Sequence, residues 1–223
     1  MNDHPDRRNT RALEPSLITD PIELAKAEAR NGLKQYDAGI QEAQSAIERG
    51  NFKLRSSLIC SLHREALNGL TSYAGIFRPG AVEIGKSRHE PPPAHLVHGL
   101  VEELCDYVND NWARATPLHL AAYVMWRLNW IHPFADGNGR TSRTVSYVIL
   151  AIRAGNVPSG SPSIPEQIVQ IRAPYFEALE AADESWKKDL LDLSKMESLL
   201  ETLLARQLKA FFESVGGQLP SEL

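Results

Sequence analysis

The most informative stretch of the sequence is HPFADGNGRTSR, residues 132–143. An almost unbroken apolar run, residues 118–131, comes before it, and apolar residues return at helical spacing over residues 145–152. Such spacing is typical of buried helices. The pattern therefore predicts two buried helices joined by a polar loop, with the polar groups at the N-terminus of the second helix.

A loop in that position has the chemistry of a phosphate-binding site. The first N–H groups of a helix have no intrahelical acceptor, and the helix dipole adds partial positive charge there. Gly137 and Gly139, on either side of Asn138, let the backbone approach an oxygen closely. Arg140 and Arg143 lie three residues apart on one helix face, so both can hold phosphate oxygens.

Two more side chains of the loop add metal and acid–base chemistry. Asp136 is an oxygen ligand suited to Mg²⁺, which binds through one or two carboxylates together with substrate phosphates. His132, just before the loop, is placed to take a proton from an attacking hydroxyl. Asp, Asn and Gly also favour ordinary turns, but a turn needs neither the histidine nor two arginines on one face.

The stretch resembles the signature of the Fic family, His-Pro-Phe-x-Asp/Glu-Gly-Asn-Gly-Arg-x-x-Arg, with every fixed position present. The resemblance implies an all-α fold, a helical bundle with a short β-hairpin flap over the active site. It also implies a Mg²⁺-dependent enzyme that transfers AMP from ATP to a Ser, Thr or Tyr hydroxyl of a target protein.

The same resemblance assigns roles to the residues of the loop. His132 would be the general base and Asp136 the Mg²⁺ ligand. Arg143 would hold the terminal phosphate, and the anion hole would be formed by Gly137, Asn138, Gly139 and Arg140. Many Fic proteins have a tyrosine near the adenine at the place of Tyr175, which makes Tyr175 a candidate nucleotide contact.

Two other functions stay open at this point. The first is a different transferase on the same site, which would move UMP, phosphocholine or phosphate. The related Doc kinases have Lys where this chain has Gly139, so Gly139 favours nucleotidyl transfer. The second is a non-catalytic nucleotide-binding regulatory module, against which the intact His132 argues because phosphate binding alone needs no base.

Residues 73–93, here called the flap segment, have the pattern of a hairpin. Residues 76–78 and 82–84 alternate in polarity around Pro79-Gly80. The residues Gly75-x-Phe77-Arg78 followed by Pro91-Pro92 are similar to the flap region of the family. An exposed hairpin edge can add a strand from a partner, so we expect the protein substrate to dock near residues 75–93.

The rest of the chain divides into four parts. We expect a mobile N-terminal tail over residues 1–18, a helical segment over 19–52 that starts at the N-cap Asp20, a Fic core over 53–188 and a C-terminal helix over 189–223. The last helix has an apolar stripe that would pack on the bundle or serve a homodimer; it consists of Leu199, Leu200, Leu203, Leu204 and Leu208.

Composition sets limits on the class of protein. The chain has 223 residues, 43% of them hydrophobic, and a net charge of −4, which argues against nucleic acid or an anionic membrane as partner. The two cysteines, Cys60 and Cys105, lie in apolar helical patterns and are interpreted as buried thiols of a reducing compartment. With no apolar run as long as a membrane span and no signal-peptide core, the expected location is the cytoplasm.

Regulation is where the sequence departs from part of the family. Many Fic proteins inhibit themselves with a helix bearing Ser/Thr, three spacers, Glu and then Gly or Asn, but here no glutamate is followed by Gly or Asn. Glu48 is the nearest imitation, with Gln44 where Ser or Thr is expected. Otherwise the enzyme is unrestrained or is restrained by an inhibitory partner protein, as in toxin–antitoxin pairs.

Overall fold

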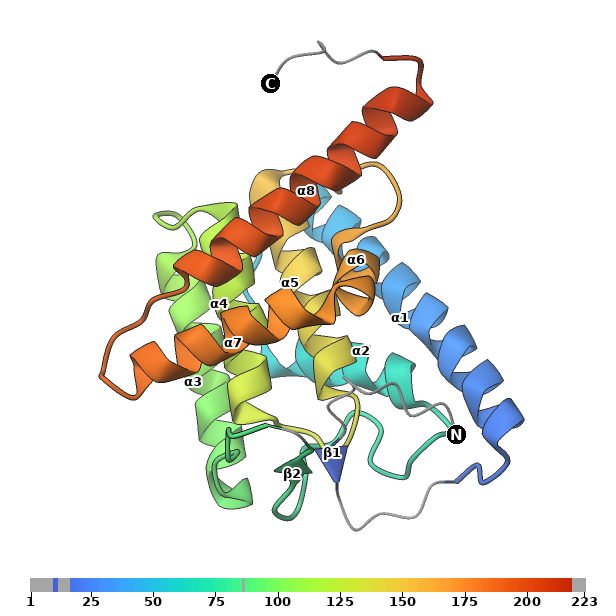
Figure 1. Ribbon diagram of the computed structural model, residues 1–223, viewed down its shortest axis with the longest axis vertical. Coiled ribbons are helices and arrows are strands. Elements are labelled where there is room, and N and C mark those ends of the chain that lie inside the picture. The colour runs from blue at the N-terminus through green and yellow to red at the C-terminus, as the bar shows by residue number, and fades with distance from the viewer. Residues whose placement is uncertain (1–9, 12–16, 86, 218–223) are drawn as a thin grey trace.

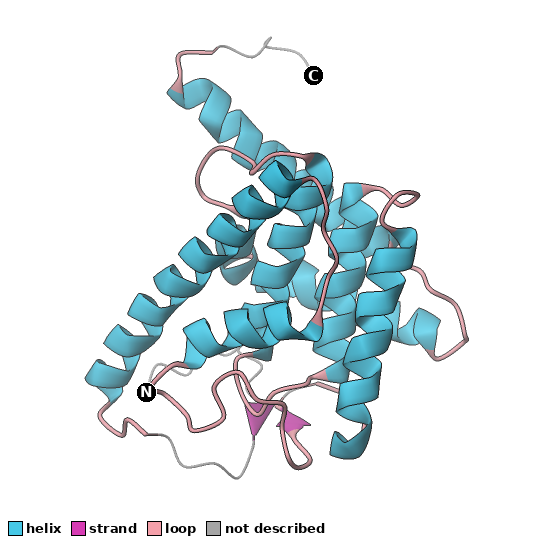
Figure 2. Cartoon of the chain, turned by 180° about the vertical axis from the view of Figure 1, so that it is seen from behind, coloured by secondary structure: helices cyan, strands magenta, loops and turns pink. Residues whose placement is uncertain are grey.

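The apolar stretches of the sequence form helices. The computed structural model describes residues 10–11, 17–85 and 87–217. Its elements are β1 (Thr10–Arg11), α1 (Pro21–Arg49), α2 (Ser56–Leu67), β2 (Glu83–Ile84), the 3₁₀ turn η1 (Ala94–Leu96), α3 (Val97–Asn111), α4 (Pro117–Ile131), α5 (Asn138–Ala154), α6 (Ile164–Gln170), α7 (Arg172–Trp186) and α8 (Ser194–Ser214). The expected mostly helical class is confirmed (Figures 1 and 2).

Helix α1 begins and ends on strong local signals. The Asp20 carboxylate accepts hydrogen bonds from the N–H groups of Ile22 (3.0 Å) and Glu23 (2.8 Å), which is the usual way of capping a helix N-terminus. At the other end Gly50 adopts a left-handed conformation with φ of 66°, which glycine does without steric cost. The helix runs through Gly32 without a break, so 29 residues form one rod.

Helices α4 and α5 form the centre of the molecule. Nearly all of α4 is buried, including Trp126 and Leu128, and α5 packs against α1, α2, α4 and α6 (Figure 1). Gly39 of α1 explains the close approach of α1 to α5, because a Cβ atom there would lie 3.1 Å from the side chains of Thr144 and Val148. The two helices that bracket the HPFADGNGRTSR loop are therefore held rigidly on several sides.

The flap segment does not form the expected hairpin. Among the described residues of this segment, only Glu83–Ile84 is a strand, and it pairs antiparallel with Thr10–Arg11 rather than with residues 76–78. The reason is that the Arg78 N–H donates to the Pro133 carbonyl at 2.9 Å. This bond ties the first half of the segment to the 132–143 loop at Arg78, so the Arg78 N–H is not available for a ladder with the second half.

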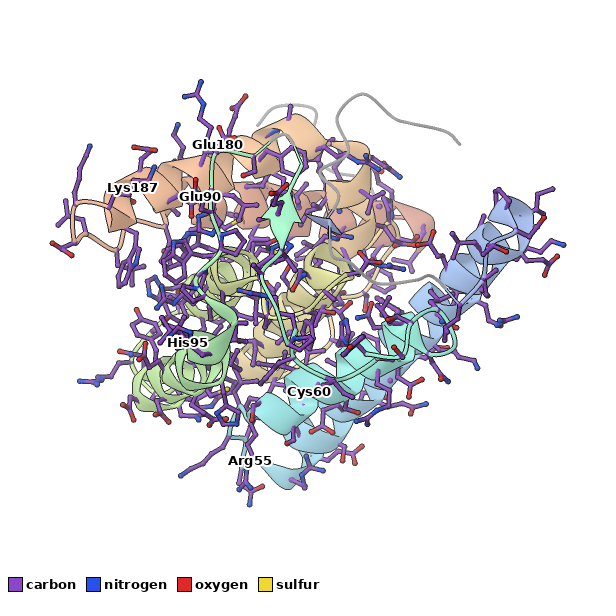
Figure 3. All side chains as sticks on the ribbon, turned by 90° about the horizontal axis from the view of Figure 1, so that it is seen from below. Arg55, Cys60, Glu90, His95, Glu180 and Lys187 are labelled. Atoms are coloured by element: carbon purple, nitrogen blue, oxygen red, sulfur yellow. The ribbon has the colours of Figure 1, made fainter. Side chains whose placement is uncertain are left out.

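The flap segment lies across one end of the bundle, as the view from below shows for the stretch that carries Glu90 (Figure 3). Residues 1–9 and 12–16 are outside the described part of the chain, and so is most of the predicted mobile tail. Thr10 and Arg11 are described and form β1. None of the described helices combines the length and the apolar character needed to cross a lipid bilayer.

Candidate active site

A cavity of about 610 Å³ opens beside the 132–143 loop. Its walls come from α1, the flap segment, the end of α4, the start of α5, α6 and α7. All the site residues predicted from the sequence line it: His132, Asp136, Gly137, Asn138, Gly139, Arg140, Arg143 and Tyr175. The size is in the range of ordinary small-molecule sites.

His132 stands at the end of α4 in an unusual backbone conformation. Its φ of 53° and ψ of 57° are left-handed, and its N–H donates to the Leu128 carbonyl at 3.0 Å. A non-glycine residue in this region stores strain and needs support from its surroundings. This conformation ends the helix and turns the chain into the loop.

The protonation state of His132 follows from its contacts. Ring atom Nδ1 lies 3.2 Å from the Asn129 carbonyl, which can only accept, so Nδ1 carries the proton and Nε2 the lone pair. Burial is the main cause that lowers the pKa of His132 to about 4. The imidazole is therefore neutral at pH 7 and able to accept a proton.

Arg78 of the flap segment supports the strained histidine. It is buried, and its Nε–H donates to the His132 carbonyl at 2.8 Å. Its other nitrogens donate to the carbonyls of Gly80 (2.8 Å) and Pro92. One guanidinium thus ties the start and the end of the flap segment to the residue that bears the candidate base.

The turn after His132 is closed by an amide. The Asn138 side chain donates to the Phe134 carbonyl at 2.7 Å and accepts from the Phe134 N–H at 2.9 Å. Because its side chain is used in this way, the contribution of Asn138 to anion binding is its backbone N–H at the start of α5. Gly137 has a φ of 74°, and a Cβ there would come within 2.4 Å of Leu67, so only glycine fits.

His63 of α2 was not singled out from the sequence, yet its side chain contacts the 132–143 loop and holds it in place. Its ring stacks on Phe134 with centroids 3.6 Å apart and planes 3° apart. The Gly75 N–H donates to Nδ1 at 2.8 Å, so Nε2 carries the proton and donates to the Asp136 carbonyl at 2.9 Å. Burial is the main cause that lowers the pKa of His63 to about 4, which keeps this bridge neutral.

Three arginines face the cavity. Arg140 lies 3.3 Å from an oxygen of Asp136 and 3.5 Å from an oxygen of Glu28 on α1. Burial lowers the pKa of the Arg143 guanidinium, with the neighbouring Arg140 and Arg172 adding to the effect. Arg172 is the third, and its buried Nη1 has no hydrogen-bond partner among the described residues. A buried guanidinium nitrogen without a partner indicates room for an anion.

Of the two glutamates Glu28 and Glu48 on α1, only Glu28 lies at the cavity. Glu48 is exposed and is 20 residues further along α1, about 30 Å from Glu28 at the usual helical rise. It is not among the residues that line the cavity, whereas Glu28 is. The residues around Glu28 lack both the Ser/Thr and the Gly/Asn of the motif, so no local signal singled it out.

Aromatic and polar groups from α7 and the flap segment also line the cavity. The buried Tyr175 hydroxyl accepts from the Asn129 amide at 2.9 Å. Nε2 of His89 in the flap segment donates to the Trp130 carbonyl at 2.7 Å, and its Nδ1 lies 4.0 Å from a carboxylate oxygen of Asp183. Phe176 and Leu179 complete an apolar wall. A flat aromatic base with polar edges suits such a surface.

The donor set restricts how a metal could bind. Within the described residues there is no group of three or more His, Cys, Asp or Glu side chains that could hold a metal ion. Asp136 is the candidate ligand, with a side chain that is 58% exposed. One carboxylate combined with substrate phosphates is the coordination that Mg²⁺ accepts.

Comparison with known proteins identifies the domain. Residues 53–150 match the Fic/DOC family. The chain is 34% identical over 128 residues to the protein adenylyltransferase Fic of Drosophila willistoni, an alignment that covers 56% of this chain and 24% of the fly protein. It is 32% identical over 127 residues to protein adenylyltransferase fic-1 of Caenorhabditis elegans, with coverage of 56% and 23%. The chain thus spans about a quarter of the length of these relatives.

Solved structures show the same fold. A Fic-domain signalling protein from Bacteroides thetaiotaomicron superposes with a TM-score of 0.70 at 21% identity, covering 91% of this chain and 78% of that one. A fragment of Fic-1 from C. elegans gives a TM-score of 0.67 at 20% identity, covering 89% of this chain and 55% of the fragment. The resemblance therefore extends beyond residues 53–150 to most of the helices.

Proposed function

We propose that this chain, whose residues 53–150 match the Fic/DOC family, is a protein adenylyltransferase that transfers AMP from ATP to a Ser, Thr or Tyr hydroxyl of a target protein. The observation that supports this best is the state of His132. Its proton is on Nδ1, its lone pair is on Nε2, and the ring lines the same cavity as the glycine turn and two signature arginines.

In the proposed reaction the target hydroxyl attacks the α-phosphorus of ATP and passes its proton to Nε2 of His132. The bond between the α-phosphorus and the bridging oxygen breaks, and pyrophosphate leaves. Arg140, Arg143 and the N–H groups of the first turn of α5 stabilise the negative charge that moves onto the pyrophosphate. His132 then holds the proton until solvent removes it.

Asp136 fits the role of Mg²⁺ ligand, because its carboxylate is exposed at the mouth of the cavity beside Arg140. When bound there, Mg²⁺ would neutralise phosphate charge and orient the triphosphate. His63 contributes by holding the Asp136 backbone. We assign no further ligand from the protein, since Mg²⁺ usually keeps several waters.

The nucleotide would lie along the cavity with its phosphates at the arginines. Arg143 would hold the terminal phosphate, and Arg172 would supply a further contact through its buried Nη1. The base would lie near Phe176 and Leu179 of α7, and Tyr175, whose hydroxyl contacts Arg143, would touch the nucleotide between its base and its phosphates. All of these residues line the cavity.

Two alternatives use the same cavity. A transferase of UMP, phosphocholine or phosphate would keep His132 and change the donor, and Gly139 in place of a lysine favours nucleotidyl transfer among these. A nucleotide-binding regulatory module would bind ATP and transfer nothing. Incubation with each labelled donor, scored by transfer to lysate proteins, separates the three.

Regulation would come from Glu28. Its carboxylate lies 3.5 Å from Arg140, where it competes with phosphate oxygens for the guanidinium. We propose that Glu28 lowers the activity of the free protein. An inhibitory partner of the antitoxin kind and a homodimer formed through α8 are further proposals; α8 has exposed apolar residues at its end, among them Phe211 and Phe212.

The remaining proposals concern the cellular location of the protein and the docking of its target. We propose a cytoplasmic location on the basis of the free thiols of Cys60 and Cys105. We propose that the target docks on the flap segment, where Ile84 and His89 line the cavity. Main-chain pairing would place the acceptor hydroxyl without requiring a particular target sequence.

The test of the function is transfer of label from α-³²P-ATP to lysate proteins. We expect His132→Ala to lower the rate by about a hundred- to ten-thousand-fold, as for other positioned bases, while ATP binding measured by calorimetry persists. The matched control is His95→Ala, which changes an exposed histidine away from the cavity. Full transfer by His132→Ala would overturn the assignment of the base.

A further inference from the structure

Asn129 lies in the last turn of α4, three residues before His132, and it lines the cavity. Helix α4 packs on both α5 and α7 (Figure 1). The side-chain amide of Asn129 bonds to one residue of each of these helices, Ser142 Oγ at 2.7 Å and the Tyr175 hydroxyl at 2.9 Å. The side chain therefore occupies the place where three helices meet at the candidate site.

The neighbours of the Asn129 amide determine which of its two ends is the nitrogen. The Met125 carbonyl, 2.7 Å away, can only accept a hydrogen bond, so the atom beside it is Nδ2. Ser142 Oγ donates its own hydrogen to the Gly139 carbonyl at 3.1 Å, and it therefore accepts from Nδ2. The nitrogen is thus used by protein partners, and Oδ1 is the end that remains.

Oδ1 of Asn129 receives no hydrogen bond from any residue in the described part of the chain. A bound nucleotide would cover the wall to which Asn129 belongs. A carbonyl oxygen that is covered without gaining a donor weakens binding, because it loses its contact with water and receives nothing in return. The ligand that fits this wall brings a hydrogen-bond donor to Oδ1.

The contacts of Asn129 indicate which part of the nucleotide meets it. Its amide bonds the Tyr175 hydroxyl, which in turn contacts Arg143, the residue proposed to hold the terminal phosphate. The base would lie near Phe176 and Leu179. Between the phosphates and the base, the only hydrogen-bond donors of a ribonucleoside triphosphate are the 2′- and 3′-hydroxyls of its ribose.

We propose that Oδ1 of Asn129 accepts a hydrogen bond from a ribose hydroxyl of the bound nucleotide and that Asn129 thereby selects ribonucleotides over deoxyribonucleotides. This inference rests on the proposed function, which gives the direction in which the nucleotide lies. A deoxynucleotide covers Oδ1 and supplies no donor, so it binds about three- to tenfold less tightly, which is the usual worth of one neutral hydrogen bond.

The first experiment measures this selection by calorimetry with ATP, 2′-deoxy-ATP and 3′-deoxy-ATP, each in the presence of Mg²⁺. We expect the unaltered protein to bind at least one of the two deoxynucleotides about three- to tenfold less tightly than ATP. The analogue that binds less tightly identifies the hydroxyl. Equal affinity for all three nucleotides would overturn the inference.

The second experiment separates the oxygen of Asn129 from the shape of its side chain. Asn129→Leu keeps the branched shape but has no acceptor, so the affinities for ATP and for the deoxynucleotide should become equal. Asn129→Ala removes the same oxygen without adding bulk and should give the same result. Asn129→Asp keeps an oxygen acceptor, and its preference for ATP should persist although the added negative charge weakens the binding of every nucleotide.

The ratio of the two affinities also excludes a purely structural role. Loss of the bonds from Nδ2 to Ser142 and Tyr175 changes the affinity for ATP and deoxy-ATP alike, so it leaves their ratio unaltered. An unaltered ratio in Asn129→Leu and Asn129→Ala, or loss of the preference in Asn129→Asp as well, would therefore overturn the inference. Asn51→Leu, which changes an exposed asparagine outside the cavity, is the matched control and should behave like the unaltered protein.

The inference and the proposed function fail in different ways. A preference for ATP that Asn129→Leu abolishes supports the ribose contact even where no AMP is transferred, because calorimetry measures binding alone. An unaltered preference in Asn129→Leu, together with normal labelling of lysate proteins by the unaltered protein, would overturn the inference and leave the proposed function intact. Absence of labelling of every lysate protein would instead overturn the proposed function.

Discussion

At the scale of single residues, three arginines and three carboxylates line the cavity, and one of the arginines is shared between two of the carboxylates. Arg140 is shared between Asp136 at 3.3 Å and Glu28 at 3.5 Å, while Arg143 and Arg172 lie near it. Asp136 is proposed to bind Mg²⁺. Glu28 has no such role, and its contact with Arg140 is what a phosphate would have to displace.

Glu28→Gln is expected to raise the initial rate of AMP transfer severalfold. Removal of the negative charge frees the Arg140 guanidinium for phosphate oxygens, and the amide keeps the volume of the side chain. The measurement is the rate at ATP concentrations below and above KM, with the gain largest at low ATP. Glu48→Gln, on the same helix but exposed, should have no effect; an equal gain in both variants would contradict the role given to Glu28.

At the scale of elements, the 132–143 loop is held by two neighbours that are distant in sequence. Arg78 ties the flap segment to the His132 carbonyl, and His63 ties α2 to the Asp136 carbonyl and the flap segment to α2. Both act through main-chain atoms of the loop. The positions of the proposed base and the proposed metal ligand are therefore set by α2 and the flap segment as much as by α4 and α5.

Stability should fall in mild acid because of these histidines. Burial lowers the pKa of His63 and of His132 to about 4, from about 6.5 in the unfolded chain. Between these values the unfolded chain binds protons and the folded chain does not. Stability is therefore lost as the pH falls from about 6.5 to about 4, by up to about 1.4 kcal/mol per pH unit for each histidine.

Thermal melts at pH 7, 6 and 5 measure this effect. We expect the melting temperature to fall at each step. The melting temperature of His63→Gln should be lower than that of the unaltered protein at pH 7 but should fall less between pH 7 and pH 5. His98→Gln, which changes an exposed histidine, is the control for a general loss of imidazole. The same pH slope in His63→Gln as in the unaltered protein would show that His63 titrates normally.

At the scale of the whole molecule, a buried side chain of α8 connects this last helix to α5, the helix that begins at the site. Gln207 is fully buried; its amide accepts from the Ile164 N–H at 3.1 Å and donates to the Pro158 carbonyl at 2.9 Å and the Tyr147 hydroxyl at 2.8 Å. The stripe expected on α8 is divided accordingly: Leu200 and Leu203 are buried, and Leu208 is exposed.

Gln207→Ala should lower the melting temperature by several degrees. The substitution leaves the buried Ile164 N–H without its partner, and an unsatisfied buried group lowers the free energy of unfolding by about 1–3 kcal/mol. In a chain of this size each kcal/mol lowers the melting temperature by about 2–4 °C. Differential scanning calorimetry checks the shift. Gln41→Ala on the exposed face of α1 is the control, and equal melting temperatures for the two variants would contradict the bridging role.

The sequence by itself determined the parts that depend on neighbours along the chain. Hydrophobic periodicity marks α4 and α5, Asp20 and Pro21 mark the start of α1, and the loop from His132 to Arg143 carries its chemistry in consecutive residues. All eight predicted site residues line one cavity for this reason: seven belong to that loop, and Tyr175 comes from a helix that the family resemblance pointed to.

Only the tertiary structure decided which distant groups complete the site. Glu28 and Glu48 both lie on α1, and the packing of α1 on α5 brings the first of them to Arg140. The strand that pairs with β2 lies 72 to 74 residues before it in the chain, and main-chain pairing leaves no mark in the side-chain pattern. His63 and Arg172 have ordinary helical surroundings in sequence. Their roles come from contacts across the fold, which local propensity does not encode.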